Sequence, residues 1–287
     1  MPRAATKRLT PPIELPAFLT MRPRTALQCF LSRCAAHGGI DVDTVDAIAT
    51  AAIANNRKGS ELDPRHAELE TRWYASLENG EPDYSVYEGD PYLGELWACW
   101  SIYSRSYLRE IANPRSMPES GGVVADLGDV RRVVDLGCGF GYTTAALAAL
   151  FPQAQVVGTN LPGTIQWNFA QKLGELHRFA LARDVSVLGA WLHTDLMFAS
   201  EYFEHQTHPV EHLREVLDAM KPRALLVANA FGTRSIGHFL TYEDEGETVT
   251  PKVIQQRFAT ELRRRGYEKQ KTGLWNNRPQ YWKRSEP

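Results

Sequence analysis

An apolar strand that runs into three alternating glycines constrains this chain more than any other feature. Residues 133–141 read VVDLGCGFG, and the apolar residues that follow, up to Leu150, predict a helix. Glycine has no Cβ and tolerates positive φ, so this turn exposes backbone N–H groups beside a helix N-terminus, where charged or polar ligand groups are favoured. The turn therefore predicts a site for a nucleotide-like cofactor.

The spacing of the glycines distinguishes two kinds of nucleotide site. Gly137, Gly139 and Gly141 follow the pattern G-x-G-x-G, and the next residue is Tyr142. A dinucleotide-binding loop reads G-x-G-x-x-G, which places its third glycine one residue later. The spacing therefore does not match a dinucleotide site.

Strand and helix signals alternate from Arg132 onward, which predicts a parallel sheet with covering helices. We expect strands near 132–136, 155–159, 195–200 and 224–230, a less distinct one near 185–188, and helices near 142–150, 163–179, 209–220 and 251–265. Two closing strands are expected within 266–273 and 280–283. The chain is thus predicted to be an α/β protein.

The residues before this alternation predict helices. Apolar residues recur at helical spacing over 45–53 and again at Leu69, Trp73 and Leu77, and a third helix is expected from Pro91 to a point before Pro114. We divide the chain into a basic, proline-rich arm (1–24), a helical cap region (25–125) and a cofactor-binding domain (126–287).

Residues further along the chain, taken together with the glycine turn, resemble a known family. Residues 195–205 (DLMFASEYFEH), 209–217 (PVEHLREVL) and 225–229 (LLVAN) follow the glycine turn at matching separations. Together they resemble the class I S-adenosylmethionine-dependent methyltransferases. The resemblance implies a doubly wound, mostly parallel seven-stranded sheet with a C-terminal antiparallel pair, and S-adenosylmethionine as cofactor.

The resemblance also implies which residues bind the cofactor. They are the loop residues and the ends of the second and fourth strands: Asp135, Gly137, Cys138, Gly139, Gly141, Asn160, Leu161, Ser200 and Glu201. In this family an acidic residue usually ends the second strand and binds the ribose hydroxyls. Asn160 lacks the charge and bidentate acceptance of a carboxylate, which predicts a weaker contact. An altered donor site and a turn that caps the next helix are both open readings of Asn160.

Methyl transfer requires in-line positioning and exclusion of water, and a base only where the acceptor must lose a proton. Our candidates for this chemistry are His205, His238 and Glu204. An imidazole titrates near neutral pH, which favours a base, but a structural Glu-His pair is an equally open reading. The candidates for acceptor binding are Tyr84, Tyr87, Tyr92, Arg234 and Tyr242; core packing or surface exposure is the alternative for each.

Composition limits the partners. The chain has 32 basic and 34 acidic side chains and a net charge of −2, which gives no general field for a polyanion. Its four cysteines form no C-x-x-C pair, which favours a reducing, cytoplasmic location and predicts no metal site. No apolar run approaches the ~18 residues of a membrane span. We therefore predict an enzyme that methylates O or N of a small-molecule acceptor. A nucleotide or nucleic-acid modifying enzyme and a non-catalytic scaffold are the alternatives.

Overall fold

The computed structural model describes Thr20 and residues 64–88, 92, 95–96, 99–188, 193–274 and 278–285. The basic arm, the helix expected over 45–53 and Pro91 lie outside these residues, apart from Thr20. The division into arm, cap region and domain stays a prediction.

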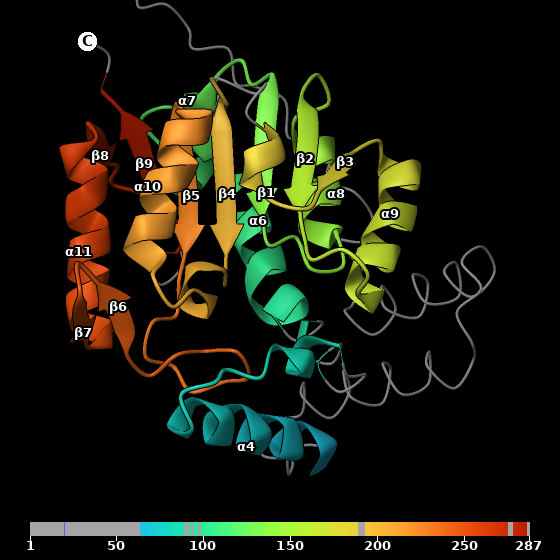
Figure 1. The fold of residues 1–287 in the computed structure, drawn as a ribbon. Helices are drawn as coiled ribbons and strands as arrows, with labels where there is room; N and C mark the ends of the chain where they lie inside the picture. Colours follow the sequence, from blue (N-terminus) through green and yellow to red (C-terminus); the bar gives the residue numbers. More distant parts are fainter. Residues whose placement is uncertain are drawn as a thin grey trace, which may run out of the picture.

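A seven-stranded sheet with the order β3-β2-β1-β4-β5-β9-β8 forms the centre of the molecule (Figure 1). Its parallel strands are β1 (Arg132–Leu136), β2 (Gln155–Thr159), β3 (Ala180–Ala182), β4 (Leu196–Ser200) and β5 (Ala224–Ala228). The strands β8 (Tyr267–Lys269) and β9 (Gln280–Arg284) close it as an antiparallel pair. The predicted doubly wound sheet with its closing pair is confirmed.

Helices cover both faces of this sheet. The main ones are α8 (Tyr142–Leu150), α9 (Ile165–His177), α10 (Pro209–Met220) and α11 (Pro251–Arg264). Val133 packs in one core cluster with residues of α8 and α9, whereas Val134 packs in the other with residues of α10 and α11. Because both faces are buried, the strands read as continuous apolar runs instead of alternating with polar residues.

The N-terminal part lies at the carboxyl ends of the strands and on the face of the sheet that α8 covers. It comprises α4 (Pro64–Glu78), the 3-10 turn η1 (Tyr84–Tyr87), the π-helix η2 (Cys99–Ser104), α6 (Arg105–Ile111), the 3-10 turn η3 (Pro114–Ser116) and α7 (Val123–Leu127). Figure 1 shows α4 beyond the carboxyl ends of the central strands. Trp73 of α4 is fully buried, and its indole N–H donates to the carbonyl of His238 at 2.8 Å. The helix is thereby fixed over the loops that follow β5.

Two expectations about strands are wrong. The third strand is β3, and residues 185–188 instead form the 3-10 turn η4 (Val185–Leu188). We also expected no strands between residues 230 and 266, but Tyr242 begins β6 (Tyr242–Asp244), which pairs with β7 (Glu247–Val249). The turn between them, Glu245 and Gly246, has φ of 54° and 79°. Positive φ at both central residues is the geometry of a tight hairpin, which the Glu-Gly pair signals only weakly.

Candidate functional site

The glycine turn is held open by hydrogen bonds to the neighbouring strand. Gly137, Gly139 and Gly141 have φ of 65°, 53° and 84°, a region that side chains disfavour. The Gly137 N–H donates to Thr159 Oγ1 at 3.0 Å, and the Cys138 N–H donates to the Thr159 carbonyl at 2.9 Å. The end of β2 therefore fixes the turn that follows β1.

The three glycines serve different purposes. A Cβ on Gly141, which precedes α8, would lie 2.9 Å from Phe179, so this glycine allows close packing. A Cβ on Gly137 would lie 2.4 Å from the ring of Tyr202. A Cβ on Gly139 would meet only the end of Leu96, at 3.3 Å. The backbone at Gly139 thus faces space, which fits a ligand laid against the turn.

Asp135 lies beneath this turn and is almost fully buried. Burial raises the pKa of its carboxyl to about 7, although the hydroxyl of Thr144, which donates at 2.6 Å, opposes the rise. Near neutral pH the carboxyl is therefore poised between its charged and neutral forms. A cation bound nearby would favour the charged form.

Asn160 ties the end of β2 to the glycine turn. Its side-chain amide donates to the Gly139 carbonyl at 2.7 Å, and its amide oxygen accepts from the Leu161 N–H at 2.9 Å. A carboxylate has no N–H with which to make the first bond. Asn160 therefore helps to position the turn through a hydrogen bond that the usual acidic residue could not donate.

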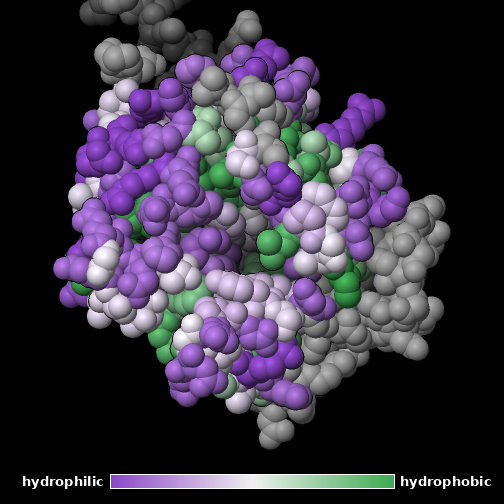
Figure 2. Space-filling view, viewed as in Figure 1, coloured by the Kyte–Doolittle hydropathy of each residue, from purple (hydrophilic) through white to green (hydrophobic). Residues whose placement is uncertain are grey.

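These residues border a cleft at the carboxyl ends of the parallel strands, where ligands bind in open α/β sheets. Its wider part has a volume of about 500 Å³ and includes Asn160, Leu161 and the rings of Tyr84 and Tyr87. A narrower part of about 60 Å³ lies against Asp135, Cys138, Gly139 and Ser200. Both parts share Tyr92, Gly137, Glu201 and His205. Figure 2 shows the surface hollowed between α4 and the ends of the strands.

Two histidines meet at the floor of the cleft. His205 ends the 3-10 turn η5 (Phe203–His205), His238 follows β5, and their rings lie edge to face with centroids 4.6 Å apart. His238 Nδ1 lies 2.9 Å from the Thr233 carbonyl and donates to it, so its Nε2 is a free acceptor. Burial lowers the pKa of both imidazoles, that of His205 well below its usual value. Both rings are therefore neutral at pH 7.

Two carboxyl groups lie beside the histidines. Glu201 has φ of 51°, and burial raises its pKa. Burial also raises the pKa of Glu204 far above its usual value, and the nearby Glu201 charge raises it further. Glu204 Oε1 accepts from the Ala230 N–H at 2.7 Å, which joins the loops after β4 and β5. A neutral Glu204 is the result.

The structure brings most of the predicted site residues together at this cleft, but not all. Glu204 is fully buried behind it, and Gly141 packs against α9. Arg234 pairs with Glu70 at 2.9 Å and lies over the ring of Tyr74, away from the cleft. Tyr242 is fully buried in the hairpin. The roles proposed for these four residues stay predictions.

Sequence reasoning missed several residues that line the cleft. The residues after β3 (Arg183, Asp184 and Val185) and those from other elements (Glu95, Trp100, Tyr142, Thr159, Gln166, Tyr202 and His212) all border it. The first set was missed because the third strand was expected five residues too late. Trp100 stacks on Tyr142 with centroids 5.1 Å apart, a contact between distant segments that no local pattern signals.

Two further searches concern only the part of the chain that the structure describes. There, no three His, Cys, Asp or Glu side chains are grouped so that they could hold a metal ion. Nor does any helix among those residues combine the length and the apolar character needed to cross a membrane.

Comparison with known proteins gives a family for the core of the sheet. A model described as a methyltransferase domain matches residues 134–228. A trans-aconitate 2-methyltransferase of Rhodopseudomonas palustris is 32% identical over 100 residues, which are 35% of this chain and 38% of the relative. A malonyl-[acyl-carrier protein] O-methyltransferase of Anoxybacillus flavithermus is 26% identical over 104 residues, 36% and 40% of the two chains. The match thus spans well under half of either relative.

Among solved structures, that of a mitomycin 7-O-methyltransferase aligns with 94% of this chain and 75% of its own, at 16% identity and a TM-score of 0.47. The sequence matches coincide with β1 to β5 and with the turn that shapes the cleft. The predicted resemblance to the class I S-adenosylmethionine-dependent methyltransferases, whose cofactor is S-adenosylmethionine, is confirmed for residues 134–228.

Proposed function

We propose that this chain transfers a methyl group from S-adenosylmethionine to an oxygen or nitrogen atom of a small-molecule acceptor. One observation supports the proposal most strongly: the glycine turn opens into the same cleft that contains two neutral histidines. The named relatives act on small molecules or on a carrier-bound acyl group, as their names state. The acceptor atom and the acceptor itself are part of the proposal.

When bound, S-adenosylmethionine supplies an electrophilic methyl group on a sulfonium. The residues that would hold the cofactor are the backbone at Gly139, the carboxyl of Asp135, and Asn160 with Leu161 at the end of β2. Asn160 keeps the Gly139 carbonyl in place through its amide. At the cofactor end of the cleft, the chain therefore offers a backbone surface whose position is fixed.

His205 and His238 are the candidates to receive a proton from the acceptor. Because both imidazoles are neutral at pH 7, each can accept a proton without first losing one. The Thr233 carbonyl fixes the His238 ring, and the Tyr87 hydroxyl lies 3.2 Å from His205 Nδ1. His238 Nε2 is thus the better-defined acceptor atom.

Aromatic rings separate this end of the cleft from solvent. Tyr87 and Tyr92 are buried and pack edge to face at 4.8 Å, and Tyr87 also contacts Trp73 of α4. Tyr84 is half exposed and stacks on Tyr87 at 6.2 Å. The arrangement supports a role for the tyrosines in excluding water and covering an acceptor.

Calorimetry with S-adenosylhomocysteine tests the donor site directly. We expect binding by the wild type and a loss of at least about 100-fold in Gly139→Arg, because the new side chain would fill the cleft. Gly80→Arg is the matched control: Gly80 also has positive φ, of 76°, but nothing within 4 Å of its would-be Cβ. Absence of binding by the wild type, or equal binding by both variants, would contradict the proposal.

Substitution of His238 tests the chemistry separately from binding. His238→Gln should lower kcat by about 10²-fold or more if the ring takes the proton, with S-adenosylhomocysteine affinity unchanged. Methyl transfer is measured with radiolabelled donor against a panel of hydroxyl and amine acceptors. An unchanged kcat would remove His238 from the mechanism.

The nucleic-acid alternative rests on residues that the structure does not describe. A nucleic-acid modifying enzyme would use the basic arm for phosphate contacts, and that arm lies outside the described residues. The cytoplasmic location stays a prediction.

A further inference from the structure

A second hollow lies beside the antiparallel closing strands of the same sheet. It runs between α11, the end of β5 and the start of β9, and has a volume of about 670 Å³. This is within the range of about 300–1,000 Å³ that is usual for small-molecule sites. We call it the α11 groove. The proposed methyl transfer assigns it no role.

One face of α11 forms a wall of this groove. The helix residues that line it are Lys252, Gln255, Gln256, Phe258, Ala259, Thr260 and Arg263. Their spacing of three or four residues places them on one side of the helix. All of them except Phe258 and Ala259 carry a hydrogen-bond donor at the side-chain end, so the wall presents a row of donors.

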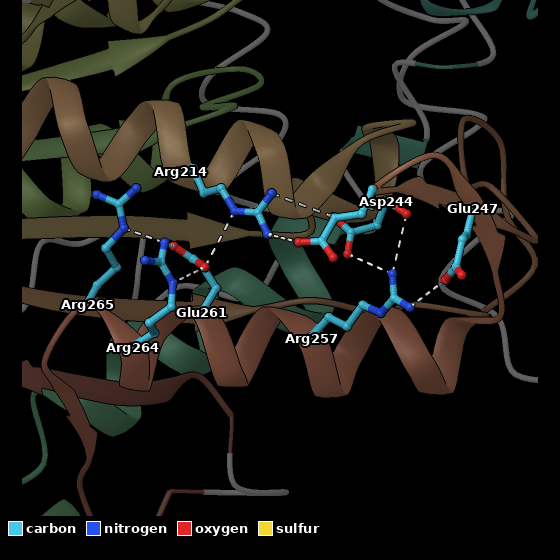
Figure 3. Close-up of polar contacts among 8 residues, drawn as sticks. Arg214, Asp244, Glu247, Arg257, Glu261, Arg264 and Arg265 are labelled. Atoms are coloured by element: carbon cyan, nitrogen blue, oxygen red, sulfur yellow. Dashed lines mark hydrogen bonds and ion pairs between the residues drawn. The ribbon is translucent and has the colours of Figure 1, made fainter.

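Four cations line the groove and no acidic residue does. Lys252 and Arg263 lie on α11, and Lys269 and Arg278 lie near the two closing strands. Within the described residues none of the four forms an ion pair with a carboxylate, whereas Arg257, Arg264 and Arg265 of the same helix all do (Figure 3). Positive charge is therefore left uncompensated on the groove side of α11 only.

A polar and an aromatic side chain complete the floor of the groove. Asn229, which follows β5, lines the groove, but its amide oxygen is shielded from solvent and is therefore not offered to a ligand. The ring of Trp282 is buried there, with the Arg263 guanidinium 5.6 Å from its centre. The contact with the ring helps to hold Arg263 at the wall of the groove.

We propose that the α11 groove binds a small organic anion: a phosphate ester or a polycarboxylate. Lys252, Arg263 and Lys269 attract and hydrogen-bond the anionic groups, because charge-assisted hydrogen bonds are stronger than neutral ones.

The groove is also linked to the cleft. Arg278 lies near enough to Glu201 for its charge to oppose the rise in that carboxyl's pKa, and its guanidinium donates to the Tyr107 hydroxyl. Glu201 borders the cleft. An anion held beside Arg278 would therefore lie next to the methyl-transfer site without occupying it.

Calorimetry on the full chain tests the groove with two probes, ribose 5-phosphate and citrate. We compare the double variant Lys252→Gln/Arg263→Gln with a control, Arg131→Gln/Lys172→Gln, which removes the same charge from exposed ion pairs elsewhere. The groove variant should weaken binding of at least one probe about tenfold or more at low ionic strength, and the control should not. The probe that is affected identifies phosphate ester or carboxylate as the preferred group.

Two results would overturn the proposal: no binding of either probe to the wild type, or an equal loss in both double variants, which would indicate general charge attraction. S-adenosylhomocysteine affinity, measured in the same variants, should be unchanged. That measurement shows that the variants are folded and separates failure of the groove from failure of the donor site.

Discussion

Glu204 and Glu261 are the same residue type and are buried to nearly the same extent, yet their pKa values are shifted in opposite directions. Glu204, beside the cleft, is 0% exposed, and burial and the Glu201 charge raise its pKa far above the usual value. Glu261, on α11, is 4% exposed. Burial raises its pKa too, but hydrogen bonds from Arg264 and Arg265 outweigh that and bring it to about 2.

The difference lies in the neighbours. Glu261 belongs to a network in which Arg214 links it to Asp244 (Figure 3). Arg265 links it in the same way to Asp218 of α10. For Glu204 the ionisable neighbour that contributes most to the pKa shift is another acid, Glu201. Buried groups without an opposite charge gather at functional sites more often than at structural ones. The ion network therefore stabilises the fold. In the cleft, by contrast, the titratable groups are buried without an opposite charge, as is typical of a site that handles protons.

The largest expected effect concerns Asp135 and pH. Its carboxyl has a pKa of about 7 in the fold and 3.8 as the reference value, so the protonated form is favoured by about 4 kcal/mol on folding. That stability is fully present below the unfolded pKa and is lost as pH rises through about 7. Asp135→Asn should not lose it, so the variant should be the more stable protein at pH 8.

Urea denaturation across that pH range measures the effect. Asp129→Asn, at an exposed position, is the control and should follow the wild type. If Asp135→Asn shows the same loss of stability with pH as the wild type, the pKa assigned to this carboxyl is wrong.

Glu261→Gln is expected to have the next largest effect. It removes a buried charge from three guanidinium groups, of which Arg214 and Arg265 keep another acidic partner. The loss should cost about 3 kcal/mol in the free energy of unfolding. In the wild type this stabilisation is fully present above the unfolded pKa of 4.5 and is lost as pH falls through about 2. Thermal unfolding at pH 7 checks it, with Glu247→Gln, at an exposed ion pair, as the control. Equal melting temperatures for the two variants would show that the network contributes little.

The smallest effect is expected for Glu204→Gln. Because Glu204 is already neutral, an amide of the same shape should change the free energy of unfolding by less than about 1 kcal/mol. The amide oxygen can still accept from the Ala230 N–H, whereas Glu204→Ala leaves that donor unpaired and should cost about 1–3 kcal/mol. If Glu204→Gln destabilises as strongly as Glu261→Gln, the carboxyl is charged and the contrast between the two regions is lost.

The strands at the centre of the sheet could be predicted because both of their faces are buried. Residues 196–199 and 224–228 are continuous apolar runs bounded by polar residues, and β4 and β5 occupy those positions. The strand at the sheet edge could not. β3 has only three residues, Ala-Leu-Ala, and alanine has little preference for strands, so its position depends on pairing with β2.

The candidate site shows the same division. The glycine turn was predictable because a local conformation requires those residues in that order. The pairing of His205 with His238 was not, because 32 intervening residues separate them and only the folded loops after β4 and β5 bring their rings to 4.6 Å. Both histidines were candidates, but nothing local indicated that they form a pair.

The sequence by itself therefore determined the parallel core, the closing strand pair and the turn that faces the cleft, because each follows from short-range periodicity or from a conformation that only glycine adopts easily. The tertiary structure decided which buried acids are charged, which face of α11 meets carboxylates and which is left positive, and that Asn160 holds the turn. Those properties depend on side chains that are distant in the sequence and close in space. The charge of these neighbours decides whether a pKa is raised or lowered.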